Sequence, residues 1–580
     1  MIEFSGTAIA RAPRELFVVL LCAISFLAFA ILLPRLFINA IRAVTRAFSR
    51  FAKLRWAPLL LLFLGVLGAR LAVLPLLPVP VPGIHDEYSY LLLGDTIAHG
   101  RLANPAHPMW MSFETFHVNW FPAYASKYPP GQGVVLALGE ILGHPWIGVL
   151  LSTALMCAVI LWMLRAWLPP SRALLGGLLV ALKFGIASYW MNSYWGGSLA
   201  ATGGALVLGA LPRILRKGRI RDTLLLGIGI AILANTRPYE GFLLCAPVLC
   251  WLVLWLAGKT ESRAPARARV TKVLAPLALV LALTTVFMGY YNWRLTGSAL
   301  LFPHTLNSKT YRSMGNFLWQ HPSALLHYHN QQFEDFYNGW EREEYDNSWA
   351  AVECVTLEKL SRAGSTYFWW GAILLLPGIP LAFRDRRMRL PVILLLVGFL
   401  GFVCVIWSMP HYAAPLTAVI FLLLVQPMRH LSLLRLRRRP LGLALSLLSV
   451  FLLFADTVRA VHRRECDPLG WTCQGDPSRA AIQEKLSHTP GKHLIVVRYA
   501  EDHNIHDDWV FNGAEIDSAK VLWARELDAA QNAKLFNYFK GRQFWLVEPD
   551  VDNTEIIPYP RNDSQPDSEG TSGPSSSTEK

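Results

Sequence analysis

Charged side chains are scarce in this sequence. Of its 580 residues, 16% are Asp, Glu, Lys or Arg and 53% are apolar, and 40 acidic residues against 54 basic ones give a net charge of +14. This shortage of charge excludes a disordered chain, and eight cysteines are too few for a compact disulfide scaffold. An ordinary soluble enzyme is also disfavoured, because soluble domains carry about 25% charged residues.

Familiar sequence motifs are missing as well. The chain has no P-loop, Rossmann fingerprint, HExxH or GxSxG pattern, and no repeat of solenoid length. The positive net charge has three explanations: nucleic acid binding, anionic lipid, or charges sorted across a membrane. The positions of the charges decide among them.

The apolar residues occur in long blocks, many of them long enough to cross a bilayer core. The sequence therefore predicts an α-helical polytopic membrane protein with about twelve transmembrane helices. The twelve spans are 15–34, 57–78, 145–165, 173–190, 196–212, 223–236, 240–257, 273–293, 367–383, 390–408, 414–428 and 441–457.

The basic residues fall in alternate connections between these spans. Six connections, 35–55, 165–172, 213–221, 259–272, 384–389 and 429–439, hold 27 of the 54 Lys and Arg residues. Because such residues concentrate in short cytoplasmic loops, we expect a multi-pass protein of the cell inner membrane with both termini extracytoplasmic (periplasmic). Arg11 and Arg14 favour the opposite orientation of the first span, but the six basic residues after that span outnumber them.

This topology places three long segments, 79–144, 294–366 and 459–580, outside the cell membrane. The first 460 residues carry a charge of +21 and the rest −7, and the positive charges flank apolar spans, so we expect no nucleic acid partner. The predicted organisation is an extra transmembrane helix with a basic loop (1–56), a membrane domain (57–458), an extracytoplasmic α/β domain (459–560) and a disordered tail (561–580).

The extracytoplasmic domain is predicted from two strands, 493–499 and 543–547, and an amphipathic helix, 528–540. Cys466 and Cys473 are close enough in an oxidising compartment to form a local disulfide; the alternative is two free thiols. The run from His503 to Asp508 contains zinc-ligand residue types, but such residues on a polar loop are usually solvated, so we expect no metal there.

Four polar motifs crowd the outer membrane surface. The first is the acidic pair Asp86 and Glu87, which opens an amphipathic pattern over 88–99 that suits a helix lying on the bilayer. Asp86 either caps that helix or serves as a general base. The second is Lys127-Tyr128-Pro129-Pro130-Gly131, where the paired prolines fix the turn that carries Lys127. Lys127 either binds a phosphate or extends its amine from the apolar region to the membrane surface, with no further role.

The third motif is the Arg237-Pro238 turn, where the guanidinium of Arg237 either binds phosphate oxygens through two nitrogens or pairs with Glu240. The fourth is His411-Tyr412-Ala413-Ala414-Pro415, where His411 either donates to a phosphate or simply ends a helix. In this order, the four motifs resemble those of bacterial polyprenyl-phosphate-sugar-dependent glycosyltransferases of the type C fold, relatives of protein O-mannosyltransferases and aminoarabinose transferases. The resemblance covers about residues 57–460.

The resemblance implies an inverting transfer of a sugar from a polyprenyl phosphate to a hydroxyl of a lipid, glycan or protein. Asp86 or Glu87 would be the catalytic base, since relatives carry Asp-Asp or a single Asp where this chain has Asp-Glu. Lys127, Arg237 and His411 would hold the phosphate, and Tyr88 and Tyr128 would orient phosphate or sugar. Some enzymes of this fold use a divalent cation, and we expect no obligatory cofactor here.

Two other classes of protein stay open. A transporter or flippase of lipid-linked glycans would also have twelve spans, but it should place charged residues near the bilayer midplane. Here Arg70 and Lys183 are the few charges within spans, and both are near enough to an end to snorkel. A non-catalytic assembly protein of the cell envelope would tolerate substitution of Asp86. The donor sugar and the acceptor are not legible from the sequence.

Overall fold

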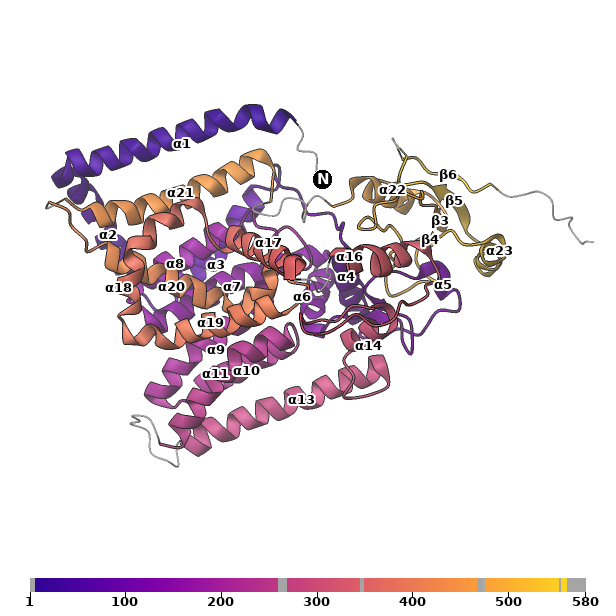
Figure 1. Cartoon of the computed structure of the whole chain (residues 1–580), viewed down its shortest axis with the longest axis horizontal. Helices are drawn as coiled ribbons and strands as arrows, with labels where there is room; N and C mark the ends of the chain where they lie inside the picture. Colours follow the sequence, from indigo (N-terminus) through magenta and orange to yellow (C-terminus); the bar gives the residue numbers. More distant parts are fainter. Residues whose placement is uncertain are drawn as a thin grey trace, which may run out of the picture.

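The computed structural model describes residues 6–258, 269–344, 349–437, 439–466, 473, 475–551 and 554–560. The chain is mostly helical, with a small mixed sheet near its C-terminus (Figure 1). The predicted disordered tail, 561–580, and residues 259–268 of the basic loop 259–272 lie outside the described residues.

One large helical bundle holds most of the apolar segments. Its elements are α1 (Gly6–Leu32), α2 (Pro34–Ala52), α3 (Ala57–Ala72), α7 (Pro145–Trp167), α8 (Pro170–Phe184), α9 (Ser198–Lys217), α10 (Ile220–Ala234), α11 (Pro238–Leu256), η1 (Val270–Leu274), α13 (Ala275–Thr296), α17 (Trp349–Tyr367), η3 (Trp370–Gly378), α18 (Ile379–Phe383), η4 (Arg386–Met388), α19 (Arg389–Cys404), η5 (Pro410–Leu416), α20 (Thr417–Leu431) and α21 (Leu441–Arg463).

By helix length and composition, the structure supports seven to nine of the twelve predicted spans. Helices coincide with all twelve predicted segments, but within the described residues only seven are long and apolar enough to cross a membrane, or nine if two bent pairs are counted. The remaining three, α3, α8 and α10, have 16, 15 and 15 residues. At 1.5 Å per residue, such helices cover about 22 to 24 Å of a hydrocarbon core of roughly 30 Å.

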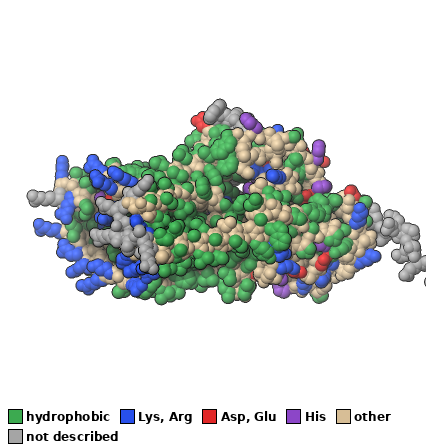
Figure 2. Space-filling model, turned by 90° about the horizontal axis from the view of Figure 1, so that it is seen from below, with side chains coloured by type: hydrophobic (Ala, Val, Ile, Leu, Met, Phe, Trp, Pro, Cys, Tyr) green, Lys and Arg blue, Asp and Glu red, His purple; other side chains and the backbone are tan. Residues whose placement is uncertain are grey.

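The outer surface of the bundle is apolar, as expected of a multi-pass membrane protein. On α13, for example, the exposed fractions of Leu283 and Val286 are 61% and 70%. Figure 2 shows hydrophobic side chains covering the middle of the molecule, between a left end rich in Lys and Arg and a right end of mixed polarity. Large apolar side chains on this scale face lipid more readily than water.

The basic loops gather at one end of the bundle, which we call the basic end. Arg165 donates to the carbonyl of Arg55, at 2.8 Å, and Arg216 donates to the carbonyl of Ala166, at 2.9 Å. The side chain of Arg172 reaches Ser432 Oγ at 2.8 Å. The connection 165–172 therefore contacts three of the other five basic connections, which agrees with their predicted common side. The compartment that the basic end faces stays a prediction.

The long segments 79–144 and 294–344 meet at the opposite end, which we call the loop end. Their elements are α4 (His85–Ala98), α5 (Trp110–Phe113), β1 (Val118–Asn119), β2 (Ala125–Ser126), α6 (Pro130–Ile141), α14 (Pro303–Tyr311), α15 (Gln331–Phe333), η2 (Glu334–Trp340) and α16 (Glu341–Glu344).

Helix α4 does not lie on the bilayer as its sequence pattern suggested. Most of its side chains are buried, because α6 packs along one side and the C-terminal region covers another. Arg70 also differs from expectation, since it is fully buried and does not snorkel. It donates to the carbonyls of Leu77 and Pro78 and to Asn192 Oδ1, and thereby fastens the end of α3 at the loop end.

The C-terminal region forms a small α/β unit against the loop end. It contains α22 (Pro477–His488), β3 (His493–Val497), β4 (Val521–Arg525), α23 (Ala529–Tyr538), β5 (Gln543–Val547) and β6 (Ile557–Pro558). The strand order is β4-β3-β5-β6; β3 runs parallel to both neighbours, and β6 is antiparallel to β5. The predicted strands and helix are confirmed as β3, β5 and α23, whereas α22 and β4 were not foreseen.

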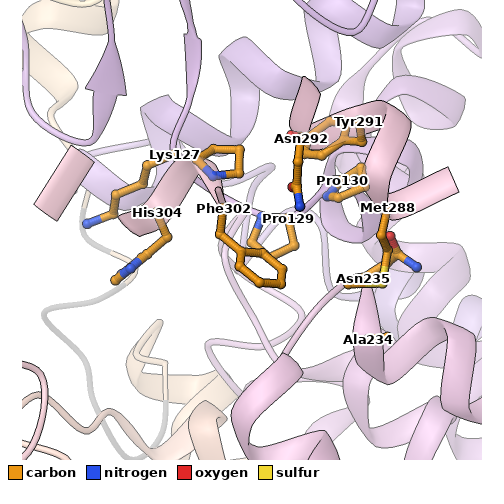
Figure 3. Close-up of a pocket in the computed structure, with 11 residues that line it drawn as sticks. Lys127, Pro129, Pro130, Ala234, Asn235, Met288, Tyr291, Asn292, Phe302 and His304 are labelled. Atoms are coloured by element: carbon orange, nitrogen blue, oxygen red, sulfur yellow. The ribbon is translucent and has the colours of Figure 1, made fainter. Parts of the chain in front are cut away.

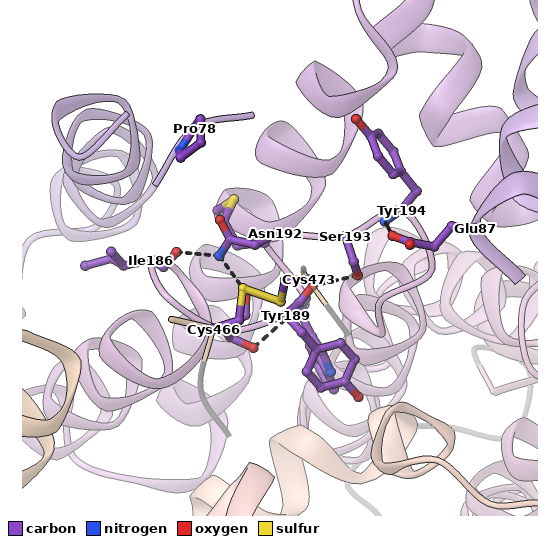
Figure 4. Close-up of a disulfide and its surroundings, with 12 residues drawn as sticks. Pro78, Glu87, Ile186, Tyr189, Asn192, Ser193, Tyr194, Cys466 and Cys473 are labelled. Atoms are coloured by element: carbon purple, nitrogen blue, oxygen red, sulfur yellow. Dashed lines mark hydrogen bonds between the residues drawn. A yellow bond between two sulfur atoms is a disulfide. The ribbon is translucent and has the colours of Figure 1, made fainter. Parts of the chain in front are cut away.

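A disulfide marks the entry to this unit. Cys466 and Cys473 are bonded, with their Cα atoms 6.2 Å apart. Figure 4 shows the bond beside Tyr189 and Asn192, in the segment that follows α8. Both cysteines are partly buried against the main apolar core, so the bond lies where the last bundle helix passes into the C-terminal unit.

Candidate functional site

The two carboxylates of the acidic pair have opposite surroundings. Glu87 is buried, and its oxygens accept hydrogen bonds from the backbone nitrogens of Gly83 (3.0 Å), Ile84 (3.4 Å) and Tyr194 (2.9 Å). Burial raises the pKa of Glu87 to about 7, against the effect of these three donors. The side chain of Asp86 keeps 22% of its surface exposed. Of the two, Asp86 is therefore the carboxylate that a second molecule can reach.

Asp86 faces a cluster of polar side chains from the next loop. The Tyr128 hydroxyl donates to one of its oxygens. Its other oxygen lies 3.7 Å from Nε2 of His117. On the far side of that imidazole, Lys127 Nζ donates to His117 Nδ1 at 2.8 Å. Asp86, His117 and Lys127 thus form a row in which the imidazole separates the carboxylate from the amine.

The proline turn that holds Lys127 docks on the turn that holds Arg237. The backbone nitrogen of Gly131 donates to Asn235 O at 2.8 Å, and a Cβ at Gly131 would lie 2.4 Å from Thr236 Cγ2, so only glycine fits here. Arg237 in turn lies over the ring of Tyr412, 4.0 Å from its centroid. The four sequence motifs are therefore linked in order, each touching the next.

Within the fourth motif, Tyr412 takes the place expected for His411. The His411 ring is buried against Trp195, with centroids 4.7 Å apart, and its Nδ1 lies 3.3 Å from the Tyr189 hydroxyl. These contacts hold η5 against the segment after α8. It is Tyr412 that meets Arg237 directly.

Tyr88 lies outside this cluster, contrary to its predicted role at the substrate. Its ring is stacked on Phe511 of the C-terminal unit, at 4.2 Å, and Arg479 lies over its other face, at 4.7 Å. The Tyr88 hydroxyl donates to Pro82 O. Tyr88 is thus a docking residue between α4 and the C-terminal unit.

The electrostatics of the cluster are those of a buried cationic site. Burial lowers the pKa of Lys127 to about 8, with Asp86 acting in the opposite direction. Burial also lowers the pKa of His304 to about 3, assisted by Lys127, Arg312 and Arg237. The pKa of His117 falls well below its usual value for the same reason, with Lys127 adding to the effect. Near neutral pH the imidazoles are uncharged, and Lys127 and Arg237 carry the positive charge.

A pocket opens beside Lys127. Figure 3 shows Lys127 and His304 side by side at one end of it, with Met288 and Asn235 at the other. The lining between these ends is mostly apolar, and the pocket reaches α10 and α13, which belong to the bundle. Its lining residues are Lys127, Pro129, Pro130, Ala234, Asn235, Met288, Tyr291, Asn292, Phe302, Pro303 and His304.

The described residues include one group with metal-ligand geometry, formed by Asp95, His99 and Glu140. It lies nine residues along α4 from Asp86, about 13 Å at the rise of a helix. Asp95 already accepts from the backbone of Ala514 and lies 2.9 Å from His99. Around Asp86 itself, the neighbours are an amine, a phenol and an imidazole, a set that does not suit the oxygen-seeking cations Mg²⁺ and Ca²⁺.

The side chains of the run from His503 to Asp508, where no metal is expected, contact other residues of the protein. His503 pairs with Asp550 at 2.7 Å, and Asp508 pairs with the buried Arg525 at 2.9 Å. The ring of His506 packs edge-on against Trp340, with centroids 4.5 Å apart. These side chains serve to hold the C-terminal unit together and against the loop end.

Three residues of the site were missed in the sequence. His117 and His304 are single histidines in long loops, and no motif marks them. Tyr412 was noted only as the neighbour of His411. His117 has a φ of 65°, a conformation that is rare outside glycine, so its backbone is held in place by the fold around it.

No family model matches the chain, and no curated protein matches its sequence. Among solved structures, it matches membrane glycosyltransferases of the type C fold over most of its length at low identity. ArnT from Cupriavidus metallidurans bound to undecaprenyl phosphate is 13% identical; the match covers 86% of this chain and 94% of that one, with a TM-score of 0.46. The oligosaccharyltransferase of Archaeoglobus fulgidus in complex with Zn and sulfate is also 13% identical, with coverages of 83% and 67% and a TM-score of 0.45.

Proposed function

We propose that this protein is an inverting glycosyltransferase that moves a sugar from a polyprenyl phosphate to a hydroxyl acceptor at the extracytoplasmic membrane surface. One observation carries the proposal. An accessible carboxylate, Asp86, stands across a neutral imidazole from a buried cation, Lys127, at the mouth of a pocket that continues toward the bundle helices.

Asp86 is the proposed general base. It takes the proton of the acceptor hydroxyl while that oxygen attacks the anomeric carbon from the face opposite the phosphate. The new glycosidic bond forms as the bond between the anomeric carbon and the phosphate oxygen breaks, which inverts the configuration. The first turn of α4 supports this role, because a helix N-terminus stabilises a negative charge.

Lys127 and Arg237 are the proposed phosphate ligands. The leaving polyprenyl phosphate carries away the bonding electrons, and cations fixed beside it stabilise the charge that develops. The guanidinium of Arg237 is held flat over Tyr412, which presents its donors in a fixed plane. A bound phosphate would keep Lys127 charged to higher pH, since an opposite charge raises the pKa of an amine.

The pocket beside Lys127, at about 20 Å³, is too small for an isoprene group in this conformation, but its apolar walls lie on the side from which the donor lipid would approach. Its apolar walls include Pro129, Met288 and Phe302, and Met288 belongs to α13, whose other face is exposed to lipid. A donor phosphate at Lys127 would therefore have its chain directed along the pocket toward the bundle surface. No metal ion is needed for any of these steps.

The test is donor cleavage by the purified full-length protein in detergent. Wild type, Asp86→Asn and Glu87→Gln would be incubated with a panel of undecaprenyl-phospho-sugars and hydroxyl acceptors, and released undecaprenyl phosphate would be measured. We expect Asp86→Asn to lower release by about 10²- to 10⁴-fold, the contribution of a general base. Release that survives Asp86→Asn would contradict the proposed base.

Two further measurements, one on the purified protein and one in cells, distinguish the two alternatives. Saturable uptake of a lipid-linked sugar by proteoliposomes, with no donor cleavage, would identify a transporter or flippase. A cell-envelope function that persists in the Asp86→Asn variant would identify an assembly protein. If the protein is a glycosyltransferase, it should cleave the donor in detergent, where transport cannot be measured.

A further inference from the structure

A second cavity, of about 460 Å³, lies between the C-terminal unit and the loop end. This volume is in the range of sites that hold small molecules, about 300 to 1,000 Å³. The proposed reaction does not use it. Its lining residues are Met111, His329, Asn330, Gln331, Gln332, Val497, Arg498, Tyr499, Arg525, Glu526, Leu527, Asp528 and Gln531.

The cavity occupies a characteristic position in the α/β unit. Val497 ends β3 and Arg525 ends β4, and the two strands are parallel and paired throughout. The floor of the cavity is therefore the carboxyl edge of these strands, the edge at which open α/β sheets bind ligands. The opposite wall comes from α5 and α15 of the loop end, so the cavity exists only because the two parts are docked.

The charges in the cavity are neutralised within the protein. Arg498 is bonded to Glu526 through two nitrogens and to Glu548 at 3.1 Å. Arg525 is paired with Asp508 at 2.9 Å and has 2% of its side chain exposed. Since each guanidinium already has its carboxylate, an anionic ligand is not favoured.

The remaining lining is rich in neutral hydrogen-bonding groups. Four amide side chains, Asn330, Gln331, Gln332 and Gln531, line the cavity together with the helix-capping carboxylate of Asp528. Three of these amides also bond within the protein: Asn330 with Glu114 and the Phe333 backbone, Gln331 with Asp335, and Gln332 with Arg525. These bonds use the nitrogen of Gln331 and the oxygen of Gln332, so the other amide atom of each can meet the hydroxyl groups of a sugar, which both donate and accept. The chemistry thus favours a neutral, polyhydroxylated ligand.

The cavity and the Asp86 site share one segment of chain. Met111 lines the cavity, and His117, six residues later, faces Asp86. Even a fully extended segment would separate them by about 22 Å at most. Between them, buried Glu114 accepts from the Tyr311 hydroxyl at 3.1 Å and from Asn330 Nδ2 at 3.2 Å, which fixes the segment to the cavity wall.

We propose that this cavity binds a neutral oligosaccharide, and that the bound chain is the acceptor whose terminal hydroxyl reaches Asp86. The second half of this statement rests on the proposed glycosyltransferase function; the first half does not. An oligosaccharide of a few units spans the distance between the two sites, so one end can be held at the C-terminal unit while the other is modified.

Binding is tested by calorimetry on the full-length protein with mannotetraose, cellotetraose and chitotetraose. Gln531→Trp narrows the cavity with a bulky ring, and we expect it to weaken binding at least tenfold; Gln531→Ala, which removes the amide without adding bulk, should weaken it about threefold to tenfold. Gln543→Trp is the matched control, because Gln543 begins β5 at the opposite edge of the same sheet. It should bind within twofold of wild type.

The outcomes separate this proposal from the proposed function. Binding of no tetrasaccharide, or equal binding by wild type and both Gln531 variants, overturns the cavity proposal, as does binding of inorganic phosphate there instead. Asp86→Asn should bind the tetrasaccharide normally. If wild type binds it but cleaves no donor, the glycosyltransferase proposal fails and the glycan site stands. If Gln531→Trp transfers sugar to every acceptor as wild type does, the acceptor role fails.

Discussion

The Tyr128 hydroxyl donates a hydrogen bond to the Asp86 carboxylate and so joins the proline turn to the first turn of α4. The Tyr128 ring is also stacked on Tyr90, one turn further along α4, with centroids 4.1 Å apart. The proposed base and the turn that carries the proposed phosphate ligand Lys127 are therefore held as one unit. Because Gly131 in that turn docks on Asn235, the unit extends to the turn that carries Arg237.

Tyr128→Phe should test this linkage. The variant keeps the stacked ring and loses one hydrogen bond to a charged group, which is worth about 1.5 to 3 kcal/mol. We expect kcat to fall roughly 10- to 100-fold at neutral pH. Tyr124→Phe is the control, since its equally buried hydroxyl donates to Asn512 O of the C-terminal unit. A Tyr128→Phe enzyme as active as this control would show that the bond to Asp86 is dispensable.

Glu87→Gln should separate the two carboxylates by their effects on stability. A glutamine accepts through one oxygen only, so its amide group would face a backbone donor at Gly83 or at Tyr194. We expect a loss of about 1 to 3 kcal/mol in the free energy of unfolding, measured by chemical denaturation, with kcat within about threefold of wild type. Asp86→Asn should instead lower kcat strongly and leave the free energy of unfolding nearly unchanged. An inactive Glu87→Gln protein of unchanged stability would instead make Glu87 the base.

Much of the fold follows from composition alone. The positions of the apolar segments were readable because a spanning helix needs a long run without charges, and the sidedness of the loops was readable because Arg and Lys cluster between runs. Span length was less readable: α8 ends at Phe184, although the apolar sequence continues to Trp190. The residues from 185 to 190 form an irregular segment that packs against the disulfide and His411. No local sequence pattern predicts this segment.

The site was predictable only in part, for a physical reason. The sequence singles out Asp86, Lys127, Tyr128 and Arg237, which the structure brings together, because prolines, carboxylates and isolated cations are conspicuous at the edge of apolar spans. His117 and His304 were missed because their positions depend on contacts between distant loops. Tyr88 lies away from the cluster because the C-terminal unit, more than 400 residues later, covers it with Phe511, a contact that no local pattern predicts. Strand β4 was missed because the apolar run before Arg525 has only four residues.

The predicted orientation can be tested with a native cysteine. Cys354 is exposed in α17, on the segment 294–366 that should face outward, and Leu433 is 75% exposed among the basic loops. In intact cells, a membrane-impermeant maleimide should label Cys354 without permeabilisation. In a Cys354→Ser background, Leu433→Cys should be labelled only after permeabilisation. The opposite pattern would place Asp86 in the cytoplasm and remove the basis for a polyprenyl-linked donor at the outer surface.

The affinity for the lipid phosphate should depend on pH through Lys127. Because burial lowers the pKa of Lys127 to about 8, the amine is mostly charged at pH 7 and mostly neutral at pH 9. A phosphate monoester has its second pKa near 6, so the ligand itself does not change charge over this range. We therefore expect the Kd for undecaprenyl phosphate to be constant from pH 6.5 to 7.5 and to rise above pH 8, by up to tenfold per pH unit.

Two variants complete this experiment. The Lys127→Arg variant should bind undecaprenyl phosphate several-fold more weakly than wild type at pH 7, because a guanidinium differs in shape from an amine. Since arginine keeps its charge above pH 8, the Kd of this variant should stay constant up to pH 10. Lys309→Arg, on the exposed side of α14, is the matched control and should follow the wild-type profile. A wild-type Kd that stays level to pH 10 would mean that Lys127 does not carry the phosphate, and that Arg237, whose charge persists over this range, holds it alone.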